Sequence, residues 1–453
     1  MPDLELKRVL KLPAVSFIAI GFMVGGGVFV FTGIVFKIAG SALPIAYALA
    51  VIPVFISMMP LAMLGSAIPV TGANYKYPSR MVSPGLAFVG IWVYAWASFF
   101  GQIPLYALGC ARYAQTLFPF LSPTLFAVAL VTFFYIVNLL GVKLAAQVQG
   151  ILVIILISAL IYYSYSGIAV INPDNFSNIM QNGPANLILG TALLTFTYFG
   201  VNGIIELGGE IVNPGKVIPR AFIIALPVVM LIYLAVAVAT VGAMPGDILQ
   251  KSAEPLIYVC QQTVGKTGIL FFTVGGAILA LTTTLNALFM VGTKSLLMIA
   301  QDQLLPRKLG QLHQRFGTPH VLLTIIWVLS VFGIVSGFSL ETLASYAALG
   351  ALIIFLPIQI AAMRFPALYP EQYRKSAFKL KGFWLRFCPL VGIIMVVFFS
   401  LIILYDLKSI WNIVWFIAFI ISGIFYYQLR KKFLLANGVR ITDLLKGKEN
   451  WDA

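Results

Sequence analysis

The stretch GFMVGGGVFVFTG, from Gly21 to Gly33, lies inside an apolar run that is long enough to cross a membrane. Its three consecutive glycines, Gly25, Gly26 and Gly27, are costly there, because a glycine destabilises a helix interior by about 1 kcal/mol relative to alanine. A backbone that leaves the helix in hydrocarbon exposes unpaired N–H and C=O groups, so a break is tolerated only inside protein or beside a wet cavity. We therefore expect either close helix packing or a binding site at this point.

The composition is that of an integral membrane protein. Of the 453 residues, 61% are hydrophobic and 9% are charged, and the mean hydropathy is +1.00, whereas a soluble domain carries about 25% charged residues. Residues 1–12 have the charges of a cytoplasmic segment rather than the pattern of a cleavable signal. The scattered cysteines, Cys110, Cys260 and Cys388, have no metal-binding spacing, and we expect no disulfide and no cofactor.

Twelve apolar segments meet the length of about 20 residues that a spanning helix needs. Several are longer, which indicates tilted or interrupted helices. The predicted spans are 13–38, 42–69, 86–118, 121–140, 144–170, 186–211, 217–244, 267–300, 320–337, 341–363, 387–405 and 409–429.

The basic residues predict the orientation. With the amino terminus in the cytoplasm, five of the 29 Lys and Arg residues fall outside, namely Lys37, Arg112, Lys251, Lys266 and Lys408. This asymmetry agrees with the positive-inside rule and predicts an even span count in the cell membrane, with both termini cytoplasmic. Because the basic residues are spread over all the inner loops, nucleic acid is not an expected partner. Segment 245–266 is predicted as a helix over the outer mouth, and 430–453 as a weakly ordered cytoplasmic tail.

The sixth span contains a second interruption, where Gly200 and Gly203 bracket Val201 and Asn202. Many transporters consist of inverted repeats whose discontinuous helices meet at the midplane. Free N–H groups at a helix terminus attract a carboxylate, and free C=O groups attract an ammonium group or a cation. Matched interruptions in spans 1 and 6 therefore favour a binding site for a zwitterion, with close packing of small residues as the alternative.

Four motifs resemble the amino acid–polyamine–organocation (APC) superfamily. The first-span stretch from Gly21 to Phe29 is similar to the family pattern G-x-x-I-G-x-G-I-F. Residues 196–220 resemble the family's sixth-span pattern, and residues 71–85 resemble the loop after its second span. Residues 300–306 resemble the family motif A-R-D-G-x-L-P. The resemblance extends from about residue 10 to residue 365.

The resemblance implies an all-α integral membrane protein with twelve transmembrane helices. Its transport core, 13–363, would have the LeuT-like 5+5 inverted repeat with discontinuous helices 1 and 6, and 387–429 would add helices 11 and 12. The implied activity is transport of amino acids or related amines by alternating access.

Site residues carried over from the family surround the two interruptions. The N–H groups of Gly25, Gly26 and Gly27 would bind the substrate carboxylate, and carbonyls near Ile20 and Met23, with those of Phe196 and Phe199, would bind the ammonium group. Phe196 would also act as a lid. The remaining predicted substrate contacts are Gly200, Asn202 and Gln102, and an interhelical hydrogen bond is the alternative for Gln102.

Two departures from the family concern charge. Asn202 replaces an acid that many members carry, which favours a neutral amino acid over a cationic substrate. Leu156 lies at a position where some members have a lysine that carries a proton. We therefore expect no proton carrier at this position.

A sodium site is a further expectation from the resemblance. Hydroxyls of Thr282 and Thr283, with carbonyls of Gly21 and Val24, would form an oxygen-rich shell, which hard cations prefer. In the alternative, the two threonines cap carbonyls of their own helix.

Glu206 and Glu210 are two acids four residues apart within the sixth predicted span. An acid inside a membrane is a functional candidate. We expect Glu210 to form a gating contact with Lys216, Arg220 or Lys294. Glu206 either pairs with a basic residue such as Lys294 or carries a coupling proton.

The sequence thus predicts a secondary transporter of neutral amino acids in the plasma membrane. Its driving force would be a proton gradient, a sodium gradient or substrate exchange. A cationic amino acid or polyamine exchanger and an ion channel are the alternatives. No nucleophile–base set or metal-ligand cluster is evident, so we do not expect an enzyme.

Overall fold

The computed structural model describes residues 8, 10–252, 255–407, 410–441 and 445, with only the backbone for Gly26 and residues 142–148. Most of the predicted amino-terminal segment, Lys408 and the end of the predicted carboxy-terminal tail lie outside the described residues.

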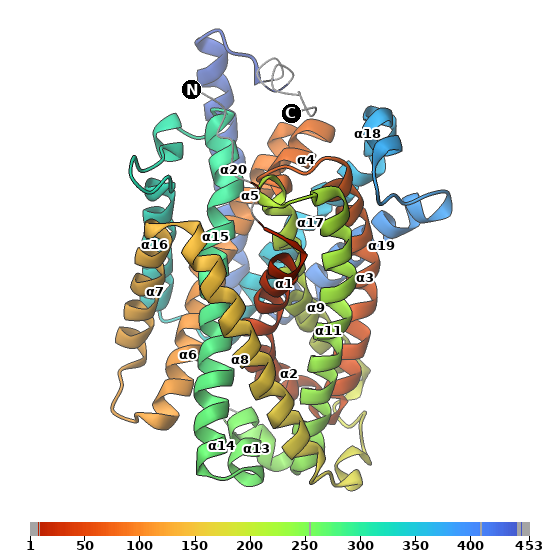
Figure 1. Cartoon of the computed structure of the whole chain (residues 1–453), viewed down its shortest axis with the longest axis vertical. Coiled ribbons are helices and arrows are strands. Elements are labelled where there is room, and N and C mark those ends of the chain that lie inside the picture. Colours follow the sequence, from red (N-terminus) through yellow and green to blue (C-terminus); the bar gives the residue numbers. More distant parts are fainter. Residues whose placement is uncertain (1–7, 9, 253–254, 408–409, 442–444, 446–453) are drawn as a thin grey trace.

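The described chain is a bundle of helices, and its β-structure consists of two isolated bridges. Most of the long helices run along the long axis of the molecule (Figure 1). Their bounds are α1 (Leu12–Gly26), α2 (Thr32–Ala39), α3 (Leu43–Ala67), α4 (Ala73–Met81), α5 (Pro84–Trp96), α6 (Ile103–Leu117), α7 (Pro123–Leu140), α8 (Val142–Ile168), α9 (Gly183–Tyr198), α10 (Gly203–Glu206), α11 (Pro214–Ala243), α12 (Gly246–Lys251), α13 (Pro255–Thr263), α14 (Lys266–Phe271), α15 (Leu279–Gln301), α16 (His320–Val335), α17 (Leu340–Leu368), α18 (Pro370–Lys375), α19 (Phe383–Asp406) and α20 (Ile410–Ala436).

Ten helical stretches of the described chain are long and apolar enough to cross a membrane. The first of them, Leu12–Ala67, contains the first predicted span and most of the second, and the shorter α16 contains most of the ninth. The other predicted spans each overlap one of the remaining stretches. The positions of the apolar helices are therefore those that the sequence predicts.

The first span is helical throughout, which differs from the expected break at the three glycines. The α-helix changes at Gly27 into a π-helical stretch, Gly27–Phe31, and α2 continues from Thr32. A π-helical turn widens the helix but keeps hydrogen bonds within the segment. The backbone therefore deviates from the α-helix without the non-helical gap that would cost several kcal/mol per unpaired group in hydrocarbon.

The sixth span changes its helix type more often. After α9 the chain forms a 3-10 turn at Phe199–Asn202, the short helix α10 and a second 3-10 turn at Gly208–Glu210. Gly200 allows this region to contact α1, because a Cβ there would lie 2.7 Å from both the backbone nitrogen of Met23 and the carbonyl carbon of Phe22. The first 3-10 turn of the sixth span is thus in backbone contact with α1, about one turn before its π-helical stretch.

Short helices cover both ends of the bundle. The predicted outer helix at 245–266 is present as two helices, α12 and α13. They lie at the end of the bundle opposite the carboxy-terminal end of α20 (Figure 1). The prediction that the weakly ordered tail begins at residue 430 is wrong for its first residues, because α20 continues to Ala436. Arg430 helps to hold this extension, since its Nε donates to the carbonyl of Gln303 at 2.8 Å.

Backbone hydrogen bonds join three segments at the end of the bundle where α20 ends. The N–H of Leu10 donates to the carbonyl of Glu210 at 3.0 Å, and the N–H of Val212 donates to the carbonyl of Leu10 at 2.8 Å. A second bridge pairs Thr71 with Leu207. These bonds tie the start of α1 and the segment before α4 to the end of the sixth span.

Candidate substrate site

A cavity lies where α1 and the irregular part of the sixth span meet α4, α5, α6, α15 and α17. Its volume is about 30 Å³, far below the 300–1,000 Å³ typical of a ligand pocket, so side chains must move before a solute enters. Its lining consists of Phe22, Met23, Asn74, Tyr94, Gln102, Tyr106, Phe196, Thr197, Phe199, Gly200, Asn202, Gly203, Val291, Ala351, Ile354 and Phe355.

The polar groups of the cavity are amides and hydroxyls, and no lining residue carries a charge. The side-chain amide of Asn202 donates to Oδ1 of Asn74 at 3.0 Å, and that of Gln102 donates to the Tyr106 hydroxyl at 3.3 Å. The side-chain carbonyl oxygen of Asn202, Oδ1, is buried and has no hydrogen-bond partner among the residues that the structure describes. Because an unsatisfied buried acceptor costs about 1–3 kcal/mol, this oxygen is suited to accept a hydrogen bond from a bound solute.

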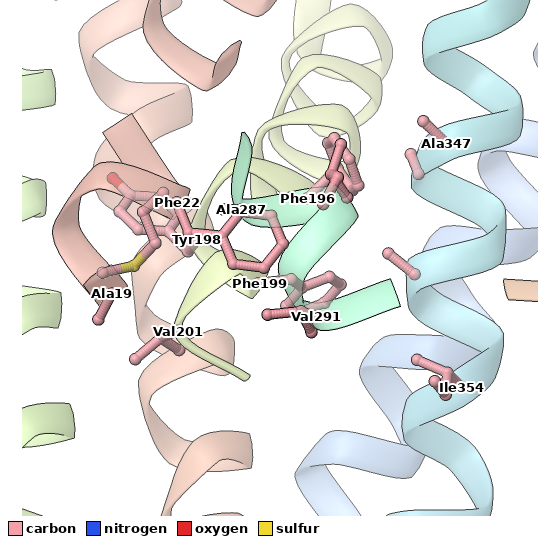
Figure 2. Packing of buried hydrophobic residues seen from close by; sticks show 14 of the residues in the cluster. Ala19, Phe22, Phe196, Tyr198, Phe199, Val201, Ala287, Val291, Ala347 and Ile354 are labelled. Carbon is pink, nitrogen blue, oxygen red and sulfur yellow. The ribbon is translucent and has the colours of Figure 1, made fainter. Parts of the chain in front are cut away.

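Aromatic rings form much of the apolar wall. Phe22, Phe196 and Phe199 lie close together beside Val291 (Figure 2). The ring of Phe196 also packs on Phe31, at a centroid distance of 5.1 Å, and the ring of Phe199 stacks on Phe355 at 4.4 Å. The wall therefore accommodates an apolar part of a solute, while the amides are available to a polar part.

Of the ten residues that the sequence assigns to substrate, six line the cavity: Met23, Gln102, Phe196, Phe199, Gly200 and Asn202. Gly25 and Gly27 are not among the lining residues. A Cβ on Gly25 would overlap Oγ1 of Thr284 in α15, and one on Gly27 would lie 2.6 Å from the Tyr233 hydroxyl. In this conformation the two glycines therefore permit close packing, which was the alternative interpretation.

The carbonyl groups assigned to the ammonium differ in their surroundings. The carbonyl of Met23 accepts a hydrogen bond from the Tyr233 hydroxyl at 2.6 Å, which leaves one of its two lone pairs for another donor. Ile20 is buried but does not belong to the lining. Gly26 is described by its backbone alone.

The residues of the predicted sodium site are occupied with other contacts. Thr282 and Thr283 donate their hydroxyls to carbonyls of their own helix, at 2.9 and 2.7 Å. A Cβ on Gly21 would lie 2.8 Å from the amide nitrogen of Gln149, which donates to the carbonyl of Thr283 at 3.4 Å. A hydrogen-bond donor therefore lies beside Gly21, where the predicted site requires oxygen ligands. Val24 is fully buried beside them.

Two buried ion pairs lie between the cavity and the end of the bundle where α20 ends. Lys294, one of the three basic partners expected for Glu210, contacts it at 2.6 Å, and Arg80 makes a bidentate pair with Asp302. Glu206 does not pair with Lys294 in the described structure. Its oxygens accept instead from the backbone N–H of Asn74 and the hydroxyl of Ser295. The described chain contains no group of three or more His, Cys, Asp or Glu residues that could bind a metal ion.

Comparison with known proteins identifies the family. The model of the amino acid permease family matches residues 10–425. The chain belongs to this family. The permease is 29% identical to the methylthioribose transporter of Bacillus subtilis (strain 168), over 95% of each chain. It is 25% identical to the branched-chain amino acid permease BcaP of the same organism, over 94% of this chain and 93% of that one. The BcaP of Lactococcus lactis subsp. cremoris is 23% identical, over 95% and 97%.

Several lining residues of the permease were missed in the sequence. Asn74 belongs to a motif that was taken for a loop, but it lies at the start of α4 and reaches Asn202. Tyr94, Tyr106 and Phe355 lie in apolar helices where nothing distinguishes a cavity-facing aromatic residue from one in the core. A polar residue such as Asn74 next to a predicted span was the available signal.

Proposed function

We propose that this multi-pass permease carries neutral amino acids across the cell membrane by alternating access. The proposal includes twelve spans, a 5+5 inverted repeat and cytoplasmic termini. The observation that carries it is the uncharged cavity at the contact between α1 and the irregular part of the sixth span. A zwitterion with an apolar side chain needs an acceptor for its ammonium group and an apolar wall, and the cavity offers Asn202 Oδ1 and the aromatic rings.

The substrate carboxylate binds, in this proposal, to N–H groups of Gly25, Gly26 and Gly27. Gly25 packs on Thr284 and Gly27 on Thr197 in the present conformation. Access to these N–H groups therefore requires α1 to shift relative to α15 and α9, and the helix to unwind locally at the glycines, because the first span is helical throughout. The small volume of the cavity is consistent with an occluded conformation that opens by such a shift.

The two ion pairs and the backbone bridges close the cytoplasmic side. The links all connect the first and sixth spans, α4 and α15, so they must break together when the cavity opens toward the cytoplasm. This gives the protein a discrete closed arrangement, as alternating access requires.

An uncharged polar solute is a second candidate substrate. One relative is named a methylthioribose transporter, and the lining contains no charged residue. Amides and phenols can bind sugar hydroxyls, and the aromatic wall can bind a methylthio group.

Uptake into proteoliposomes tests these alternatives. Radiolabelled leucine, valine, lysine, putrescine and methylthioribose are supplied separately, under an imposed proton gradient, an imposed sodium gradient, or with internal unlabelled solute. We expect saturable uptake of the neutral amino acids, and weak competition by lysine and putrescine.

The result also distinguishes the mechanisms. Uptake driven only by internal solute indicates exchange, and non-saturable flux indicates a channel. The control variant is Glu371→Gln, which changes an exposed carboxylate outside the spans. Uptake of lysine or putrescine in preference to every neutral solute would refute the proposed substrate class.

A further inference from the structure

Glu206 is a buried carboxylate that stands apart from the ion pairs around it. It is 1% exposed, and its oxygens accept from the N–H of Asn74 at 2.6 Å and from the hydroxyl of Ser295 at 2.9 and 3.2 Å. Within the described chain, no Lys, Arg or His lies within 4.0 Å of it. A buried charge without a cation is costly, so this carboxylate depends on its hydrogen bonds.

The titratable groups that face Glu206 come from four elements. They are Tyr77 of α4, Tyr94 of α5, Lys294 of α15, and Glu210 in the 3-10 turn Gly208–Glu210 of the sixth span. Burial, and to a smaller extent the charge of Glu206, raises the pKa of the Tyr77 phenol, which therefore stays protonated. Lys294 contacts Glu210, and Arg80 contacts Asp302 nearby. Glu206 is thus the acid of this group that has no counter-ion in contact.

Asn74 connects Glu206 to the cavity. Its backbone N–H donates to Glu206, and its side-chain oxygen accepts from Asn202, which carries the unpartnered Oδ1. Ser295 connects Glu206 to α15, next to Lys294. The hydrogen bonds of this one carboxylate therefore span the elements that must separate when the cytoplasmic side opens.

We propose that Glu206 is a proton-binding site whose deprotonated form holds the cytoplasmic side closed. This inference rests on the proposed transport function and deepens it by naming the coupling ion and its site. When α4 and α15 move away, the carboxylate loses the N–H of Asn74 and the hydroxyl of Ser295, and water reaches it. A proton from cytoplasmic water then binds to a carboxylate oxygen. It stays bound while the cytoplasmic side closes, and it leaves through the cavity to the outer side when that side opens, so that one proton crosses the membrane in each cycle.

The sign of the pH dependence follows from these contacts. A carboxylate accepts from both donors more strongly than a neutral acid does, because hydrogen bonds to charged groups are the stronger ones. Lowering the cytoplasmic pH therefore weakens closure and favours the open arrangement. Glu206→Gln mimics the protonated acid and should remove this dependence.

The first test compares pH profiles of uptake in proteoliposomes for the wild type, Glu206→Gln and the exposed control Glu371→Gln. We expect the wild type and the control to move protons across the membrane during solute uptake, as recorded by a pH-sensitive dye in the lumen. Glu206→Gln should exchange solute without proton movement and with a flat pH profile. A Glu206→Gln protein that keeps the wild-type profile would overturn the proposal, as would a wild type that moves no protons.

The second test needs no solute, so it remains informative if the proposed transport function fails. Infrared difference titration of the purified protein detects the carbonyl band of a buried protonated carboxyl group. We expect a titrating band that Glu206→Gln removes and Glu371→Gln retains. Ser295→Ala serves if Glu206→Gln does not fold, and it should raise the midpoint by about one pH unit, because it removes a donor to the charged form. A band that is absent from the wild type, or a midpoint that Ser295→Ala leaves unchanged, contradicts the proposal.

Discussion

Replacing Glu210 by glutamine breaks the ion pair with Lys294 while keeping the size of the side chain. The two charged atoms are 2.6 Å apart, and the side chains are 9% and 8% exposed. Removing one partner of a buried pair costs about 3–5 kcal/mol, because the other charge stays buried alone. With the small remaining exposure we take about 3 kcal/mol, which corresponds to roughly a 100-fold shift toward arrangements in which Lys294 reaches water.

Amide hydrogen exchange measures this shift without any substrate. The N–H groups of Leu10, Gly72 and Asn74 all bond to Glu206 or Glu210, so opening of this end exposes them. We expect Glu210→Gln to accelerate their exchange by about 100-fold, since exchange follows the free energy of local opening. Lys375→Met, in an ion pair that is 81% and 71% exposed, is the matched control and should change nothing here.

The double variant Lys294→Met with Glu210→Met completes the cycle. Replacing both charges by apolar side chains is often neutral or stabilising, so protection should return to near the wild-type level. The reasoning is refuted if Glu210→Gln leaves the exchange of these three amides unchanged. It also fails if the double variant opens as readily as the single one.

Three further predictions concern packing and specificity. Gly350→Ala should lower the free energy of unfolding by about 1–3 kcal/mol, because its Cβ would overlap that of Ala97. In thermal unfolding, the double variant Ala97→Gly with Gly350→Ala should regain the lost stability. A double variant that stays as unstable as the single one would contradict this packing. Tyr233→Phe removes the hydroxyl that donates to the Met23 carbonyl and should cost about 1–3 kcal/mol in the same assay, whereas Tyr405→Phe, at a 93% exposed position, should cost nothing. Asn202→Asp places a carboxylate in the uncharged lining; competition assays should show lysine binding about tenfold better, or about 1.4 kcal/mol, and unchanged selectivity would argue against contact between Asn202 and substrate.

The positions of the spans were predictable, because an apolar run of sufficient length has few alternatives to a helix in a membrane. The contact between the two irregular spans was predictable for a related reason. Glycines cluster where a backbone must deviate or approach another, and Gly200 does approach Met23. The pairing of Glu210 with Lys294 was anticipated among three possible basic partners.

Other features depend on tertiary contacts that the sequence does not reveal. Binding and close packing both require the absence of a Cβ, so Gly25 and Gly27 could not be assigned before Thr284 and Tyr233 were placed beside them. The π-helical stretch at Gly27 was missed because the same glycines are compatible with a full break. Asn74 was missed because the helix that directs it to the cavity is short and polar.

The bridges at Leu10 and Thr71 affect which mutations this end of the protein can accumulate over evolution. The hydrogen bonds of Leu10 to Glu210 and Val212 use main-chain atoms alone, so substitutions of neighbouring side chains leave them intact. An insertion or deletion between Leu10 and α1 would instead shift the register and misalign both bonds. We therefore expect lineages of such permeases to vary in residue identity here while keeping the length of the segment.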